Sequence, residues 1–479
     1  MKKILIICSF AALAVSCKKN IQDLNTETKR PLSVTPSSLF ANAQKKLVDE
    51  LTSSSVNQNI FRLLAQQWTE TTYTDESNYD LGTRNIPQNF WDTIYTRSVK
   101  NFTEAARLIP TQDPTYVDAK TVKNESAITE IMTVYTYYVL VTVYGNIPYT
   151  KAMDINNVTP AYDDAATIYS DLLTRLDAAL GKLDVSGDSF GASDLLFGGD
   201  VSKWVMFGNS LKLRMGMQLA DADATKAKTV VEAASPKAMG SNADNAAFAY
   251  QGAPPNTNPI WVDLVQSGRK DFVAANTLVD VMNGLNDPRR AFYFTGDSTT
   301  TATVYTGGKY GSSNNYATYS KPGPKLLKQD FEALLLDYPE MEFIRAEAIE
   351  RGMNVGGTAA LHYANAITAS IQYWGGSATD AATYLAQPSV AYATAAGTYK
   401  QKIGIQKWLA LYNRGFDAWT EWRRLDYPQL VPGVDALTDI PLRYPYPVQE
   451  QNLNTKNYNA AATAIGGDLV TTRLWWDKF

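Results

Sequence analysis

The sequence predicts an all-α protein of stacked helices that form a single body, with long irregular loops between them. Two observations carry this prediction. Apolar residues recur at steps of three and four along most of the 479 residues, which is the spacing of one helix face. Segments rich in Gly, Asn, Tyr and Thr separate these runs, notably 240–260 and 295–323, and loops of that length are usually functional. Length alone suggests about three domains of roughly 150 residues, but stacked helix pairs pack as one continuous body.

The N-terminus carries the pattern of an exported lipoprotein. Two lysines precede an apolar stretch at 4–15, which is shorter than the roughly 20 residues that span a bilayer as a helix. The segment 13–17, LAVSC, fits a lipoprotein cleavage motif whose cysteine receives the lipid, and several acyl chains anchor a protein stably. We therefore predict a signal peptide at 1–16, a tether lipidated on Cys17 at 17–36, and a globular body at 37–479.

Five helical runs are clearest, at 128–143, 168–183, 204–219, 403–412 and 416–422. Asp163 and Asp164 precede the second run, where a helix start favours acidic side chains. Pro339 near a first helical position and Gly352 after the last turn bound a further helix. Helix pairs are evident, but no repeat period near 34 residues emerges. "Stacked helices" is therefore as far as periodicity leads.

Composition excludes several classes of function. Cys8 leaves with the signal peptide, so the mature chain has no disulfide and its stability comes from core burial. A net charge of −4 and a pI near 5.4 give no basic footprint for nucleic acid. With His362 as the one histidine, imidazole and thiolate metal sites are nearly excluded. We predict no cofactor and no metal, with oxygen-ligated calcium left open.

Six segments follow one another along nearly the whole mature chain: 143–149 (VYGNIPY), 203–214 (KWVMFGNSLKLR), 286–289 (NDPR), 343–352 (FIRAEAIERG), 406–424 (QKWLALYNRGFDAWTEWRR) and 443–447 (RYPYP). With the lipoprotein motif they resemble the SusD/RagB family of outer-membrane nutrient-binding lipoproteins, especially its second, SusD-like subgroup. The resemblance implies four tetratricopeptide-like helix pairs and a lipid-anchored, non-catalytic protein at the cell surface. It also implies delivery of glycan or peptide to a TonB-dependent, SusC-like outer-membrane transporter. Lys18 and Lys19 stand where surface-exported members often carry acids, which leaves the leaflet open.

Two polar aromatic stretches are the candidate ligand site. Flat rings stack on the apolar face of a sugar while amides and carboxylates take its hydroxyls. The first stretch, 68–89, contains Trp68, Tyr73, Asp75, Asn78, Tyr79 and Arg84. The second, 305–319, contains Tyr305, Tyr310, Asn314 and Tyr316, and Trp261 lies in the long segment before it. The same residues suit peptide capture, and exposed aromatics also serve protein interfaces.

Most residues of the six segments are better explained as architecture. Trp204, Trp408, Trp419 and Trp422 lie on apolar helical stripes, which are core positions. We expect Glu347 to meet a buried arginine, because charges are almost never buried unpaired. The Glu421, Arg423 and Arg424 cluster reads as ion pairing at a helix end.

Enzyme alternatives have little support. The segment 187–191, GDSFG, fits G-x-S-x-G, but a nucleophile elbow needs a strand before it and a helix after it, and neither is apparent. Two other classes stay open: a helical scaffold without a small ligand, and a glycoside hydrolase with two carboxyls roughly 5–10 Å apart. We expect a clustered aromatic pocket without such a pair.

Overall fold

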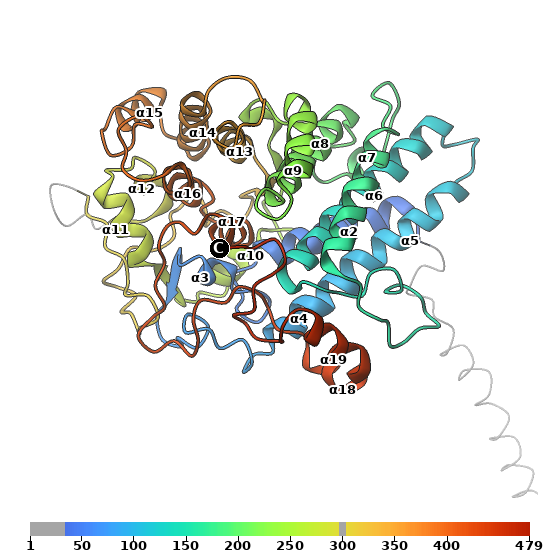
Figure 1. Cartoon of the computed structure of the whole chain (residues 1–479), viewed down its shortest axis with the longest axis horizontal. Helices are drawn as coiled ribbons and strands as arrows, with labels where there is room; N and C mark the ends of the chain where they lie inside the picture. Colours follow the sequence, from blue (N-terminus) through green and yellow to red (C-terminus); the bar gives the residue numbers. More distant parts are fainter. Residues whose placement is uncertain (1–33, 297–302) are drawn as a thin grey trace, which may run out of the picture.

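Helices dominate the chain in the computed structural model, which describes residues 34–296 and 303–479 (Figure 1). The predicted signal peptide, Cys17 and nearly all of the predicted tether lie outside the described residues. The first described helix, α2, spans Pro36–Thr52, so it begins at the last residue of the predicted tether. The prediction of an all-α fold is confirmed.

Four pairs of sequential helices build the body of the described chain. They are α6 (Ala119–Tyr144) with α7 (Ala165–Leu180), α8 (Val201–Gln218) with α9 (Ala224–Ala234), α13 (Tyr338–Glu350) with α14 (Ala359–Trp374), and α16 (Tyr399–Ala410) with α17 (Gly415–Leu425). In Figure 1, the pairs of the C-terminal half lie opposite α6 and α7, with α8 and α9 between them. This arrangement matches the helix pairs that the family resemblance implied.

Shorter elements fill the space between the pairs. Helix α2 packs against α5 (Lys100–Leu108) and the π-helical turn Ile94–Val99. The other helices are α3 (Phe61–Leu64), α4 (Ile86–Thr93), α10 (Pro259–Trp261), α11 (Asn276–Gly284), α12 (Arg290–Tyr293), α15 (Ala378–Leu385), α18 (Val448–Leu453) and α19 (Thr455–Ala464).

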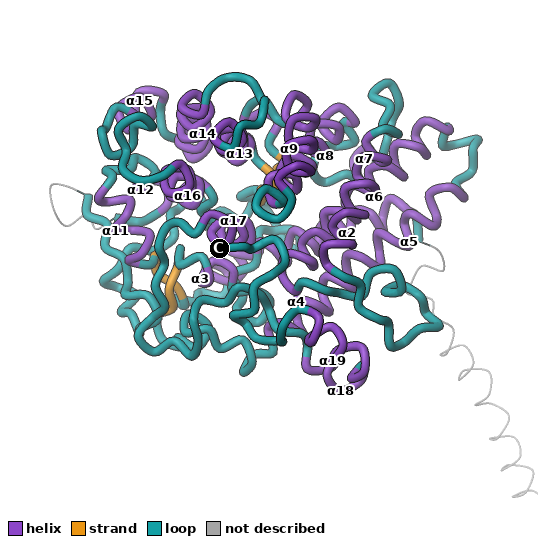
Figure 2. Tube along the Cα trace, in the orientation of Figure 1, coloured by secondary structure: helices purple, strands orange, loops and turns teal. Residues whose placement is uncertain are grey.

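Two short antiparallel strand pairs were not predicted. Strand β1 (Trp68–Glu70) pairs with β3 (Phe272–Ala274), and β2 (Ala246–Phe248) pairs with β4 (Ala333–Leu336). In Figure 2 the strands beside α3 lie among the longest loops. Each strand is three or four residues long, too short to show the alternation that identifies a strand in a sequence.

The predicted helix starts are confirmed by their caps. The Asp164 carboxylate accepts a hydrogen bond from the Thr167 amide at 2.8 Å, and Asp337 accepts one from the Glu340 amide at 3.0 Å. Such bonds satisfy amides that have no partner within the helix. Two predicted ends are too long, because the apolar runs to Leu183 and Tyr412 continue past the ends of α7 and α16.

Helix α6 runs through the core. Among the described residues it alone is long and apolar enough to cross a bilayer, and 89% of its apolar window is buried inside the protein. Trp204, Trp408 and Trp419 are also buried, as predicted, and Trp422 is half-buried against the core.

Buried ion pairs join the C-terminal helix pairs. Glu347 on α13 has no exposed surface and accepts two hydrogen bonds from the Arg424 guanidinium on α17, both at 2.6 Å. Glu421 contacts Arg424 at 2.6 Å and Lys407 of α16 at 2.8 Å. The predictions for Glu347 and for the Glu421–Arg424 pair are therefore confirmed.

Arg423 behaves differently from the prediction. It makes no ion pair with a described carboxylate but donates to the carbonyl oxygens of Thr142 at 3.0 Å and Leu442 at 2.8 Å. Its guanidinium also lies 3.5 Å from the centre of the Trp419 ring. Burial lowers the pKa of Arg423 to about 9. This arginine ties α17 to α6 through the main chain.

Candidate functional site

The two predicted ligand stretches lie side by side although more than 200 residues separate them in sequence. The Asn78 side-chain amide donates to the Gly311 carbonyl at 2.8 Å. The Asn314 main-chain amide donates to the Thr71 carbonyl at 2.8 Å, and its side-chain amide to the Glu70 carbonyl at 3.0 Å. The pairing of β1 with β3 brings a third segment, just before Phe272, to the same place.

A glycine lets these loops cross closely. Gly311 has a φ of +72°, and a Cβ on it would lie 2.8 Å from the Asn78 side-chain oxygen and 3.0 Å from the Gly433 Cα. The loop that contains Gly433 is held in turn by a bond from the Leu437 amide to the Asn78 carbonyl at 2.9 Å. Positive φ and this lack of space both favour glycine.

Five of the predicted ligand residues are buried and form the frame of this region. They are Trp68, Asn78, Tyr79, Tyr310 and Asn314, which are 1, 6, 3, 6 and 6% exposed. The Trp68 indole donates to the Tyr412 hydroxyl at 3.1 Å, and the Tyr310 hydroxyl donates to the Leu63 carbonyl at 2.7 Å. The expectation that these five contact a ligand is corrected, since they offer no face on which a sugar could stack.

The other members of the first stretch reach the surface. Tyr73 is 72% exposed, Asp75 is exposed and Arg84 is half-buried. Tyr73 and Arg84 line a depression of about 190 Å³ together with Glu70, Thr71 and Lys270, among others.

Tyr316 of the second stretch joins this surface through a lysine. The Lys270 ammonium, which lines the depression, lies 5.7 Å from the centre of the half-buried Tyr316 ring. Trp261 on α10 and Tyr305, whose ring lies 5.7 Å from the Arg290 guanidinium, do not line the depression. The structure thus brings Tyr73, Arg84 and Tyr316 together and leaves Trp261 and Tyr305 apart.

Sequence reasoning missed the charged residues of this surface. Arg269, Lys270 and Asp271 line the depression directly before β3, and Lys321 lies over the other side of the Tyr316 environment, 5.4 Å from the ring centre. The available signal was the run of turn-forming and charged residues at 267–271, SGRKD, before a short apolar segment.

A pair of carboxyl groups borders the depression, contrary to expectation. Glu70 and Glu76 are 4 and 0% exposed, their carboxyls lie in hydrogen-bonding contact, and Arg84 pairs with Glu76. Burial, with the neighbouring Glu76, raises the pKa of Glu70 well above its usual range, so Glu70 keeps its proton at neutral pH.

This pair does not have the geometry of a glycosidase. Retaining enzymes hold their two carboxyls about 5–5.5 Å apart and inverting enzymes about 6.5–9.5 Å, with the sugar between them. Two buried carboxyls in mutual contact leave no room for a glycosidic bond.

The serine motif also lacks its catalytic surroundings. Ser189 lies in the loop after α7, and its hydroxyl donates to the Gly199 carbonyl at 2.8 Å. Both ring nitrogens of His362 are engaged, one with Glu342 and one with the Gly356 carbonyl, each at 2.9 Å. Within residues 34–296 and 303–479, no group of three His, Cys, Asp or Glu side chains could hold a metal ion.

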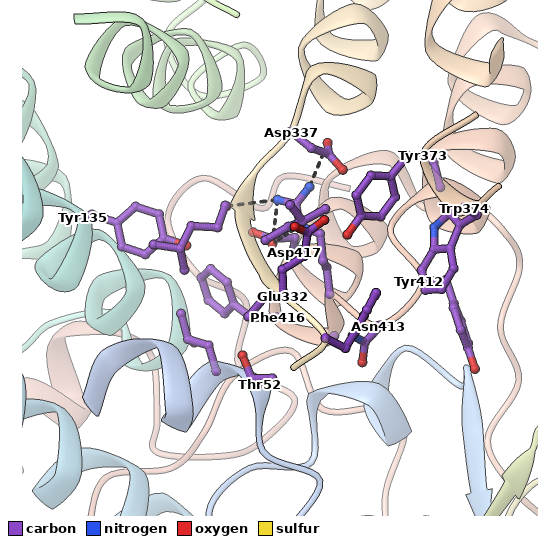
Figure 3. A pocket seen from close by; sticks show the side chains of 18 residues that line it. Thr52, Tyr135, Glu332, Asp337, Tyr373, Trp374, Tyr412, Asn413, Phe416 and Asp417 are labelled. Carbon is purple, nitrogen blue, oxygen red and sulfur yellow. Dashed lines mark hydrogen bonds and ion pairs between the residues drawn. The ribbon is translucent and has the colours of Figure 1, made fainter. Parts of the chain in front are cut away.

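An enclosed cavity in the core is part of an ion-pair network (Figure 3). Arg414 contacts Asp337 at 2.9 Å and Glu340 at 2.7 Å, and Arg214 contacts Asp417 at 3.0 Å. The cavity measures about 30 Å³, which is enough for about one or two waters. It is a packing feature and not a glycan site.

A larger, more apolar hollow of about 590 Å³ lies between α4, α5 and the segment 148–160. Trp91, Tyr95 and Met153 line it beside Ile155, which is 91% exposed. None of the predicted ligand residues contributes to this hollow.

Fold and surface together define a helical-repeat protein whose loops present tyrosines and cationic side chains around a shallow depression. The chain belongs to the SusD-like family described as starch-binding and associating with the outer membrane, whose model matches residues 28–447. None of the curated proteins compared matches the chain.

Solved structures agree with this assignment. A chitin-binding protein superposes with a TM-score of 0.81 at 25% identity, covering 93% of this chain and 100% of its own. A chitin-binding SusD homologue from Flavobacterium johnsoniae gives 0.75 at 25% identity, with coverages of 92% and 97%. A SusD homologue from Bacteroides uniformis gives 0.75 at 26%, with 92% and 99%.

Proposed function

We propose that this chain is a lipid-anchored outer-membrane protein that captures glycan at the cell surface and passes it to a TonB-dependent transporter without catalysis. The observation that carries the proposal is the meeting of the two polar aromatic stretches at one depression. Family membership over most of the chain supports it, as do the printed names of two similar structures, which call them chitin-binding.

The proposed contacts are Tyr73, Arg84 and Tyr316, with Asp75 at the edge. An exposed ring such as Tyr73 offers an apolar face for a sugar and a hydroxyl for hydrogen bonding. Their neighbours are fixed by main-chain hydrogen bonds between loops, so the side chains are held in place before a ligand arrives, which lowers the cost of binding.

Lipid anchoring and transporter delivery rest on the LAVSC motif that ends at Cys17 and on the family description. The anchor would keep the binding surface close to the membrane, where a ligand released by this protein can be taken up by a transporter.

Isothermal titration calorimetry of the mature chain from Asn20 onward tests capture. The probes are oligomers of N-acetylglucosamine, oligomers of glucose, acidic glycan oligomers and mixed peptides, with product analysis after each titration. We expect saturable glycan binding without products. Tyr73→Ala should weaken it about tenfold, since stacking on a ring contributes about 0.5–1.5 kcal/mol beyond buried area.

Tyr116→Ala is the matched control, because Tyr116 is 85% exposed between α5 and α6. Products would indicate an enzyme, and binding of peptides alone would indicate peptide capture. Silence across the panel would favour a scaffold without a small ligand.

A further inference from the structure

Two lysines flank the ring of Tyr316 at the edge of the depression. The ammonium groups of Lys270 and Lys321 lie 5.7 and 5.4 Å from the ring centre. They come from different segments, one just before β3 and one after the second predicted stretch. The ring therefore lies between two positive charges in addition to offering an apolar face.

These two charges are not neutralised by the part of the chain that the structure describes. No described carboxylate forms an ion pair with Lys270 or Lys321, whereas the neighbouring arginines are paired: Arg84 with Glu76, and Arg269 with Asp271 at 2.7 Å. The paired groups cancel each other's charge, so the two lysines decide the sign of the local potential.

The acid at the floor of the depression does not offset them. Glu70 lines the depression but lies in contact with the buried Glu76, and two carboxyls in contact cannot both ionise. A proton on Glu70 removes its charge and adds a hydrogen-bond donor. Asp75 is exposed but is not among the lining residues.

We propose that this site selects anionic glycans, with a sugar face on Tyr316 and its carboxylate or sulfate between Lys270 and Lys321. This inference rests on the proposed glycan capture and names its substrate class. Lysine acts as a compact point charge, unlike the planar fork of arginine. The shared chemistry is therefore a sugar anion, and planar carboxylate and tetrahedral sulfate are both accepted.

The test compares glycans that differ only in charge. Calorimetry with the mature chain uses an oligogalacturonate hexamer and its fully methyl-esterified form, then a κ-carrageenan hexamer and its desulfated form. In 20 mM salt each charged probe should bind at least about fivefold more tightly than its neutral partner, as for about 1 kcal/mol from one close charge pair in water. The difference should shrink in 500 mM salt, where screening is strong. The two pairs also show whether carboxylate, sulfate or both are accepted.

Variants assign the effect to the lysines. Lys270→Gln and Lys321→Gln should each weaken binding of a charged probe about fivefold and leave neutral probes unchanged, while Lys270→Arg retains binding. Lys182→Gln is the control, an exposed lysine after α7 and outside this surface. Thermal midpoints verify that each variant is folded.

Equal or tighter binding of the neutral forms, insensitive to salt and to both lysines, would overturn this inference and leave glycan capture intact. Silence from every glycan, charged or neutral, would remove the proposed function itself and this inference with it.

Discussion

Replacing Glu347 with glutamine tests whether the most buried acid of the six segments stabilises the fold. Its carboxylate accepts two bonds from Arg424 at 2.6 Å and one from Arg351 at 2.8 Å. Burial raises the pKa of Glu347, but the charge of Arg424 outweighs burial and lowers it from 4.5 to about 2. Glu347→Gln removes the charge and leaves Arg424 with Glu421 as its one acidic partner.

The expected loss of stability follows from this pKa. A shift of about 2.5 units at about 1.36 kcal/mol each gives about 3.4 kcal/mol at pH 7. Breaking a buried pair by removing one partner costs about 3–5 kcal/mol, which agrees. Because the folded pKa is depressed, this stability is complete above the unfolded value of 4.5 and is lost as pH falls toward 2. At pH 3 about one unit, or about 1.4 kcal/mol, should remain.

Urea unfolding at pH 7 and pH 3 measures both quantities. The matched control is Glu350→Gln, which replaces an exposed acid one turn later on the same helix. The reasoning is refuted if Glu347→Gln costs no more than Glu350→Gln at pH 7, or if its cost is the same at both pH values.

Three further predictions concern stability, loop order and anchoring. Burial raises the pKa of Glu50 to about 8 from 4.5, so stability should fall as pH rises between these values, by about 2.7 kcal/mol from pH 5 to pH 7; urea unfolding of Glu50→Gln should lack this fall, and parallel profiles would contradict it. Gly311→Ala should cost about 1–2 kcal/mol through its positive φ and the close Asn78 oxygen and speed proteolysis of the second stretch, whereas Gly284→Ala, with open space around its Cβ, should not. Cys17→Ser should move the protein from the membrane fraction to the soluble fraction, and retention in the membrane would argue against lipidation at this residue.

Local signals made the helices predictable. The Asp164 and Asp337 caps and the three-and-four spacing act within one or two turns, so the sequence alone contains them. The short strands depend on a partner about 200 residues away for β1 and β3. No local pattern encodes such a pairing, and it went unpredicted.

Exposure within loops was the main limit on predicting the site. Tyr73 and Tyr79 lie six residues apart in a segment without periodicity, yet one is 72% and the other 3% exposed. A tyrosine that supports a loop and one that faces solvent look alike in sequence. The convergence of the two stretches could not be predicted either, because it depends on long-range bonds such as that from Asn78 to Gly311.

Hydrogen–deuterium exchange of the mature chain, with and without the tightest-binding glycan, tests the central claim most directly. The account predicts slower exchange on binding in the segments at 70–84, 266–272 and 309–321, with no change around the apolar hollow at 148–160. Protection confined to 148–160 would contradict it and would move the ligand site to that hollow.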